Sequence, residues 1–218
     1  MIKPSVYDED YFMRGIETGK SAYENYTWRA ELTIPMAMTI IDELKIDRKT
    51  TILDYGCAKG YLVKALRLLH RKAYGVDVSR WAINNLDPVV KSFCKLIDPA
   101  GDGSLFDVVM DLCISKDVFE HIPETDLQGS IDRIAAKEMF AVIPLGEDGV
   151  FRAPDNNLDV THVTCRPEQW WLDFFENSGW SVINWGHRIE GIKDRYKHLP
   201  SAHGFFHLAS KKFWTNNR

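Results

Sequence analysis

A glycine-containing turn that joins a predicted strand to a predicted helix constrains the fold of this chain more than any other sequence feature. Thr51–Tyr55 is a run of β-branched and apolar residues, and Gly56 and Gly60 follow it within five residues. Tyr61 to about His70 then carries leucines at helical spacing. Glycines at such a turn let the backbone approach a ligand where a side chain would clash. The segment therefore predicts an α/β sheet with a ligand site at the turn, because ligands bind at the carboxyl ends of strands in an open parallel sheet.

Short strand and helix patterns alternate along the chain, which is typical of parallel sheets built from βαβ units. Upstream of the turn, Trp28–Leu44 has the pattern of an amphipathic helix despite Pro35. The pattern as a whole predicts a doubly wound, Rossmann-like, mostly parallel sheet of seven strands with a C-terminal antiparallel hairpin. Further strands are predicted at Ala73–Asp77, Phe93–Ile97, Asp111–Ser115, Met139–Ile143, Trp180–Ile189 and Phe205–Phe213, and further helices at Arg80–Leu86 and Pro167–Asn177.

The composition excludes several classes of protein. A length of 218 residues fits one α/β domain better than two. The formal net charge is −4 and there is no large Lys/Arg cluster, which argues against a long nucleic acid as partner. No apolar run approaches the ~20 residues of a membrane span, and the N-terminus lacks a signal or transit pattern, so we expect a cytoplasmic protein without membrane contact. The four scattered cysteines argue against a structural zinc and a disulfide framework.

The spacing in the turn distinguishes two classes of nucleotide. A dinucleotide site requires G-x-G-x-x-G, which would fall on Gly56, Ala58 and Tyr61, so two of its three glycines are missing. An S-adenosylmethionine site has no pyrophosphate and tolerates G-x-G-x-G, which falls on Gly56, Ala58 and Gly60 with a single departure of one methyl group. Asp77 ends the next predicted strand, where an acid can accept hydrogen bonds from a ribose diol. The spacing favours S-adenosylmethionine.

Three segments in order resemble the motifs of the class I S-adenosylmethionine-dependent methyltransferases. Ile52–Gly60 resembles the first motif of that family, and Gly75–Ser79 resembles the second, which ends the second strand with an acid. Asp111–Ile122 resembles the motif of the fourth strand, which in many small-molecule methyltransferases ends in a Leu-Glu-His-Ile-like run. The resemblance covers about Thr51 to Ile143. It implies S-adenosylmethionine as cofactor, residues 1–48 as a helical N-terminal extension or lid, and residues 49–218 as the methyltransferase domain.

The resemblance also implies roles for individual residues. Asp54, Gly56 and Gly60 are expected to line the methionine portion of the cofactor. Asp77 is expected to hold the ribose, and Val78 to pack on the adenine. The remaining candidates for cofactor contact lie in the turn or at the end of the fourth strand, and are Cys57, Ala58, Ser115, Lys116 and Asp117.

An acid near the adenine amino group is a further expectation from the family. Asp98 stands thirteen residues before Asp111, where the family often has this acid. Asp102 is a competitor for the same role, and a solvated turn acid is an equally good interpretation of Asp98.

Two histidines are the candidates for a catalytic base. Methyl transfer from a sulfonium is an in-line displacement, so the enzyme must mainly align the reactants, and a base is needed only if the acceptor must lose a proton early. His121 follows the fourth strand at the ligand-binding edge, and a packing histidine is the alternative interpretation. His162 lies in the long loop after the fifth strand, where the family often places substrate contacts, and an exposed loop histidine is the alternative.

The N-terminal segment is rich in aromatic residues and is expected to cover the site. Tyr11 and Tyr23 are the candidates for contact with the methyl acceptor, together with His162. Asp117 and Asp155–Asn157 only faintly resemble a metal site, because an Asp-Asn-Asn run is usually a turn, so we expect no metal.

These observations predict a methyltransferase that acts on a small molecule, with O-methylation favoured by the two histidines. A sugar, a glycan precursor or a secondary metabolite is the expected acceptor class. Ser115–Val118 lacks the Asn/Asp-Pro-Pro-aromatic sequence of enzymes that methylate exocyclic amines. A non-catalytic S-adenosylmethionine-binding module and an NAD-dependent oxidoreductase are the rival hypotheses, and the sequence leaves a homodimer open.

Overall fold

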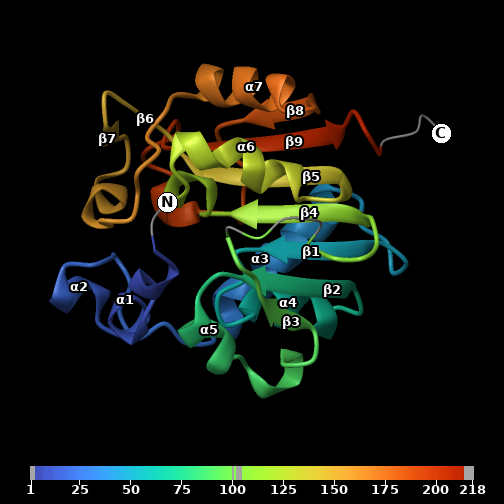
Figure 1. The fold of residues 1–218 in the computed structure, drawn as a ribbon, viewed down its shortest axis with the longest axis horizontal. Helices are drawn as coiled ribbons and strands as arrows, with labels where there is room; N and C mark the ends of the chain where they lie inside the picture. Colours follow the sequence, from blue (N-terminus) through green and yellow to red (C-terminus); the bar gives the residue numbers. More distant parts are fainter. Residues whose placement is uncertain (1–2, 100, 102–104, 214–218) are drawn as a thin grey trace.

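The centre of the molecule is a seven-stranded sheet in the order β3-β2-β1-β4-β5-β9-β8 (Figure 1). The computed structural model describes residues 3–99, 101 and 105–213. β9 pairs antiparallel with both β5 and β8, whereas the strands from β3 to β5 pair in parallel. The strands are β1 (Thr51–Tyr55), β2 (Lys72–Asp77), β3 (Cys94–Leu96), β4 (Met110–Lys116), β5 (Ala136–Pro144), β8 (Trp180–Gly186) and β9 (His203–Ser210).

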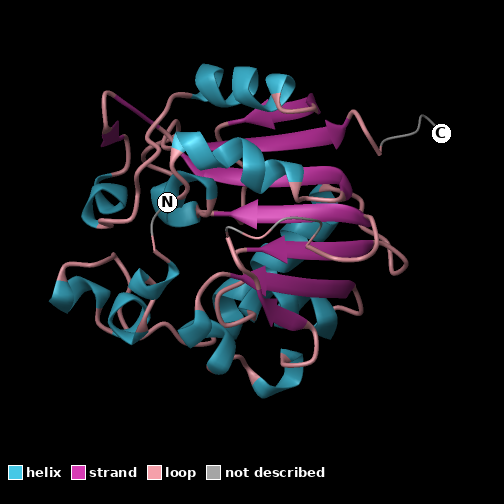
Figure 2. Ribbon diagram, in the orientation of Figure 1, coloured by secondary structure: helices cyan, strands magenta, loops and turns pink. Residues whose placement is uncertain are grey.

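Helices cover both faces of this sheet (Figure 2). Neighbouring residues of a strand point to opposite faces, so Ile52 and Leu53 of β1 enter two different apolar cores. Helices α3 and α4 pack with Ile52, and helices α6 and α7 pack with Leu53. The helices after the N-terminal segment are α3 (Ala30–Glu43), α4 (Tyr61–Leu68), α5 (Arg80–Asn84), α6 (Glu124–Asp132) and α7 (Glu168–Asn177).

The N-terminal segment lies beside the edge of the sheet where the parallel strands end (Figure 1). It contains η1 (Pro4–Val6), α1 (Glu9–Met13) and α2 (Gly15–Thr18). The Asp8 carboxylate accepts a hydrogen bond of 3.0 Å from the Tyr11 amide and so caps α1. Phe12 of this segment stacks on Trp81 of α5 with ring centroids 5.3 Å apart. The segment is therefore held against the main body by aromatic packing.

The predicted fold class is confirmed: the sheet is seven-stranded and mostly parallel, with the antiparallel pair β8 and β9 at the C-terminus. The predicted bounds of β1 agree with the structure, while β8 ends at Gly186 instead of Ile189, because the chain turns there and forms a short Ile189–Ile192 bridge. No helix in the described part of the chain is long and apolar enough to cross a bilayer.

Several short elements were not predicted, and two of them carry site residues. η3 (Phe119–His121) follows β4, and η4 (Pro154–Leu158) lies in the loop that precedes α7. The others are helix α6, the hairpin β6 (Gly146–Glu147) and β7 (Val150–Phe151), η2 (Pro88–Val90) and η5 (Asp194–Tyr196).

Candidate active site

A cavity opens at the carboxyl ends of β1, β2 and β4, beneath helix α1. Its inner volume is about 140 Å³, and it is open to solvent on one side. Its walls come from the N-terminal segment, from the turns after β1, β2 and β3, and from the residues that follow β4. Segments far apart in the sequence therefore line one cavity.

The turn after β1 adopts a left-handed backbone at each position of the G-x-G-x-G pattern. The φ angles are 83° at Gly56, 47° at Ala58 and 74° at Gly60. A Cβ at Gly56 would lie 2.4 Å from Cγ2 of Val118, which itself lines the cavity. Gly56 is thus required both by its φ and by the close approach of the segment after β4.

Asp77 joins this turn to the end of β2. Its Oδ2 accepts a hydrogen bond of 2.7 Å from the Ala58 amide, and its Oδ1 accepts one of 2.7 Å from the Ser79 amide. Burial raises the pKa of Asp77, and the amide donors oppose that shift. The Val78 amide is a third backbone donor to this carboxylate, and a carboxylate has about four acceptor positions, so acceptor capacity remains for a ligand. Asp77 and the adjacent Val78 both line the cavity.

Five of the eleven residues expected to contact the cofactor line the cavity, and six do not. Asp54 is buried at the end of β1, where burial raises its pKa to about 7. Cys57 points away from the cavity, since its Sγ occupies the space beside Gly75. The residues in the lining are Gly56, Ala58, Asp77, Val78 and Asp117, and those outside it are Asp54, Cys57, Gly60, Asp98, Ser115 and Lys116.

Asp98, the candidate for the acid near the adenine, lies outside the cavity lining. Asp98 lies on an adjoining hollow that it shares with Val78 and Pro99. Its carbonyl oxygen accepts a hydrogen bond of 2.7 Å from Nη1 of Arg133. Asp102 lies outside the described residues. Asp98 is therefore near the cavity but belongs to its outer rim.

Asp117 at the end of β4 is held between two ammonium groups. Lys116 Nζ lies 2.5 Å and Lys193 Nζ 2.6 Å from Asp117 Oδ2. Burial opposes the ionisation of Asp117, but the two lysines outweigh it and hold the pKa of the carboxyl well below its usual range. Burial in turn lowers the pKa of Lys193 to about 8. The sequence analysis missed Lys193, because it reaches the site from the loop between β8 and β9.

His121 lies on the cavity wall, and a chain of hydrogen bonds determines which of its nitrogens carries the proton. Its Nδ1 lies 2.8 Å from the Thr161 hydroxyl, which donates a bond of 2.5 Å to Oδ1 of Asp159. Because the hydroxyl proton points to Asp159, the Thr161 oxygen accepts from His121 Nδ1–H, and Nε2 keeps its lone pair. Burial, and then the neighbouring His162, lower the pKa of His121 to about 4.

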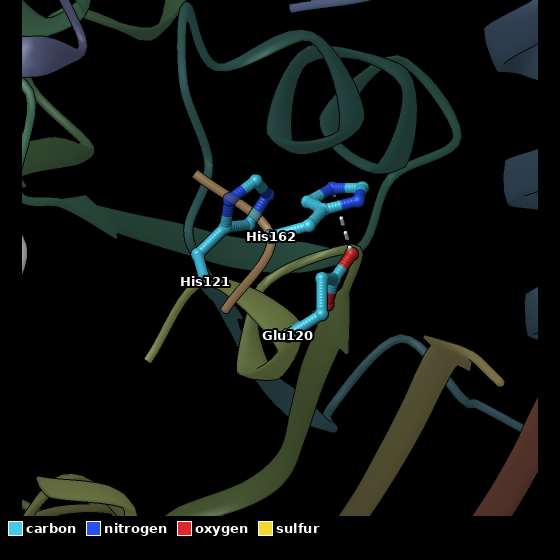
Figure 3. Close-up of side chains that lie close together, drawn as sticks. All are labelled: Glu120, His121 and His162. Carbon is cyan, nitrogen blue, oxygen red and sulfur yellow. Dashed lines mark ion pairs between the residues drawn. The ribbon is translucent and has the colours of Figure 1, made fainter. Parts of the chain in front are cut away.

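His162 lies beside His121 (Figure 3) and is not part of the cavity lining. The two ring centroids are 4.6 Å apart. His162 Nδ1 donates a hydrogen bond of 2.7 Å to the Asn156 carbonyl, so its Nε2 also keeps a lone pair. Its side chain is only 9% exposed, so it is not the exposed loop histidine of the alternative interpretation. Burial lowers its pKa.

The two tyrosines expected to contact the acceptor both line the cavity. Tyr11 donates a buried hydrogen bond of 2.8 Å to Oδ2 of Asp159, and its ring packs on that of Tyr23. Tyr7 was missed by the sequence analysis although it also lines the cavity, with its ring centroid 5.8 Å from that of His121. Its position next to the candidates Tyr11 and Tyr23 in the same aromatic segment was the available signal.

Comparisons with known proteins agree with this arrangement. The profile of a family described as a methyltransferase domain matches residues 35–184, which is more than half of the chain. A solved complex between the Haloferax volcanii Trm112 methyltransferase activator and a methyltransferase resembles the chain with a TM-score of 0.62 at 14% identity, and the match covers 84% of this chain and 91% of that chain. Among curated protein sequences no match is found.

Two further solved structures share the fold. A TehB-like SAM-dependent methyltransferase from Corynebacterium glutamicum has a TM-score of 0.57 at 17% identity, with 81% of this chain and 88% of that chain covered. The glycopeptide N-methyltransferase MtfA, solved with sinefungin, has a TM-score of 0.61 at 12% identity, with 88% of this chain and 91% of that chain covered.

Proposed function

The chain belongs to the class I S-adenosylmethionine-dependent methyltransferases, and on that premise we propose that it methylates an oxygen atom of a small molecule bound against His121. The cofactor of the family is S-adenosylmethionine. The observation that carries the proposal is the Nε2 lone pair of His121 at the cavity wall, held there by Thr161 and Asp159.

We propose that the turn after β1 and the end of β2 hold the cofactor. The left-handed turn brings backbone instead of side chains to the cavity, and Asp77 has acceptor positions left for ribose hydroxyls. Val78 lies beside it for the adenine, and Asp117 also belongs to the lining. A close-approach turn and two buried carboxylates in one cavity fit a nucleoside with an attached amino acid.

When bound, S-adenosylmethionine supplies the methyl group: the acceptor oxygen would form the new C–O bond while the C–S bond breaks, and the electron pair of that bond would stay on sulfur. His121 takes up the hydroxyl proton of the acceptor at Nε2, while Thr161 keeps Nδ1 protonated. Because the pKa of His121 is about 4, the ring is neutral at pH 7 and available as an acceptor. His162 packs on His121 and positions its ring.

We propose that the N-terminal segment closes the site as a lid, and we confine the lid to residues 3–29. Pro4, Tyr7, Tyr11, Phe12 and Tyr23 contribute to the cavity lining. Helix α3 contributes Ala37 and Ile40 to the core on one face of the sheet and so belongs to the main body. A cavity that is partly covered by aromatic rings supports a small acceptor over a polymer.

The test is a turnover assay with a panel of hydroxylated small molecules that includes sugars, glycan precursors and phenols. For at least one class of acceptor we expect release of S-adenosylhomocysteine. The product should be heavier than the acceptor by roughly 14 mass units, the mass of one CH₂, and should carry the new methyl group on oxygen. Binding of S-adenosylhomocysteine is measured in parallel by calorimetry. Tight binding without turnover across the panel would favour the non-catalytic module, and methylation on nitrogen would contradict the oxygen assignment.

A further inference from the structure

Glu120 is a fully buried carboxylate whose two oxygens have no hydrogen-bond partner among the described residues. It lies in η3, directly before His121, and its side chain is 0% exposed. An unpartnered buried carboxylate costs several kcal/mol unless it is neutralised or paired. The group therefore requires a partner that the described side chains do not supply.

The rings of His121 and His162 lie next to each other beside Glu120 (Figure 3). Hydrogen bonds to Asn156 and Thr161 occupy the Nδ1 atoms, which leaves both Nε2 atoms free. His162 Nε2 lies 3.9 Å from Glu120 Oε1. One potential ligand atom from each of the three residues lies within 4.8 Å of the others. Two ligand atoms ~2.1 Å from one ion lie about 3.4 Å apart at a tetrahedral angle, so binding would require the side chains to close by about 1 Å.

We propose that Glu120, His121 and His162 bind a divalent transition-metal cation. Two imidazoles and one carboxylate suit Zn²⁺, Mn²⁺, Fe²⁺ or Co²⁺, and three protein ligands leave positions open for other oxygens. The outer contacts have the form that metal-binding histidines require, since each Nδ1 bonds to a fixed oxygen that orients its ring. The cation neutralises Glu120. None of these three ligands belongs to Asp155–Asn157, the run that faintly resembles a metal site in the sequence.

The consequence for methyl transfer rests on the proposed function. His121 lines the cavity, so a cation at its Nε2 lies at the wall against which the acceptor is proposed to bind. An acceptor hydroxyl in an open coordination position is oriented by the cation, and its pKa is lowered. His121 then acts as a ligand instead of as the base, and the hydroxyl proton passes to solvent.

The test is metal binding by the full chain after EDTA treatment and dialysis. Titration with Co²⁺, followed by absorption, and with Mn²⁺, followed by electron paramagnetic resonance, is expected to show one site per chain. Glu120→Gln and His162→Gln are expected to weaken binding by at least about 100-fold, because loss of an outer contact alone costs about 10- to 100-fold. His207→Gln is the matched control, since His207 pairs with Glu138 at 2.8 Å on the sheet and no third ligand joins them within the part of the chain that the structure describes.

Binding of S-adenosylhomocysteine by each variant shows that it is folded. Absence of a Co²⁺ or Mn²⁺ site in protein that binds S-adenosylhomocysteine overturns the proposal, as does a site that Glu120→Gln leaves unchanged. Turnover is measured separately, with and without added metal. A metal site in a protein that methylates no acceptor would refute the proposed function and leave the site intact, whereas full activity of metal-free protein would leave His121 as the base and overturn the catalytic role of the cation.

Discussion

Two walls of the cavity are built in different ways. The turn wall comes from the ends of two adjacent strands and consists of Gly56, Ala58, Asp77 and Val78. It presents mainly backbone to the cavity. Its one carboxylate, that of Asp77, accepts hydrogen bonds from the Ala58 amide in the turn after β1 and from the Ser79 amide two residues further along the chain. Its shape therefore depends on local conformation.

The histidine wall presents Tyr11 and His121 to the cavity, and these two are held from behind by residues of a third segment, namely Asp159, Thr161 and His162. Its contacts bridge large separations: Tyr11 bonds to Asp159, and His121 bonds to Thr161. A wall made of backbone can serve the same ligand in many proteins, whereas a wall made of remote side chains can change with each acceptor. We therefore propose that the first wall holds the cofactor and that the second determines the specificity for the acceptor.

Replacement of His121 by Ala gives the largest expected effect and tests the histidine wall. Turnover should fall by about 10²- to 10⁴-fold, because the general base or its metal ligand is removed. The dissociation constant of S-adenosylhomocysteine should stay within about twofold, since the turn wall is untouched. Comparable losses of turnover and of cofactor binding would show that the two walls are not separate.

The free energy of unfolding of the protein should depend on pH through His121. The pKa of His121 is about 4 in the folded chain and 6.5 when unperturbed, so below pH 6.5 the unfolded chain takes up a proton that the folded chain does not. Stability is therefore lost as the pH falls from 6.5 to 4, by about 2–3 kcal/mol from this group at pH 4.5. In urea unfolding, the His121→Gln variant should lack this contribution to the fall in the free energy of unfolding between pH 6.5 and about 4.5. The His198→Gln variant, in which an exposed histidine is replaced, should retain it.

Gly56→Ala tests whether the turn wall depends on backbone conformation and close approach. The left-handed φ and the contact with Val118 together should cost about 3 kcal/mol of stability and impair cofactor binding. Gly149→Ala is the matched control, because its φ is 79° but a Cβ there would meet nothing within 4 Å. It should cost only about 1 kcal/mol. Equal costs in thermal or urea unfolding would remove the steric argument.

Asp77→Ala should weaken S-adenosylhomocysteine binding by about 1–3 kcal/mol, because ribose hydroxyls and two backbone amides lose their acceptor. Calorimetry measures this change. Asp98→Ala is expected to weaken binding by less than about tenfold, since Asp98 lies on the adjoining hollow. A larger effect of Asp98→Ala would place the adenine differently.

Tyr11→Phe gives the smallest expected effect and tests the lid. It removes one buried hydrogen bond to Asp159, worth about 1 kcal/mol. The KM of the acceptor should rise by up to about tenfold with the affinity for S-adenosylhomocysteine unchanged. Limited proteolysis within residues 14–29 should be faster. An unchanged KM and digestion rate would separate Tyr11 from lid closure.

The same contrast explains how much could be predicted from the sequence. β1, its turn and β2 are each specified by a contiguous run of residues, so the sheet and the position of Asp77 followed from local patterns. Helix α6 was missed because it buries only Leu127 and Ile131 and is otherwise polar, so its helical pattern is weak.

The site residues that were missed depend on packing between remote segments. Lys193 reaches Asp117 only because β9 inserts between β5 and β8 and places the preceding loop at the end of β4. Glu120 stood in the recognised Glu-His run, but its burial without a partner is a property of the folded chain. No local sequence pattern predicts the Lys193–Asp117 ion pair or the burial of Glu120.

The contacts of Asp159 have a kinetic consequence. One of its oxygens holds Tyr11 of the N-terminal segment and the other holds Thr161, the residue that orients His121. The amide of Val160 also donates to the Lys20 carbonyl, so the cover and the loop are latched at two adjacent residues. Under the proposed function, opening of the lid would break these bonds and release the Thr161 hydroxyl that orients His121, and closing would restore the orientation of the ring. Proton uptake by His121 would then be favoured only while the lid excludes bulk water.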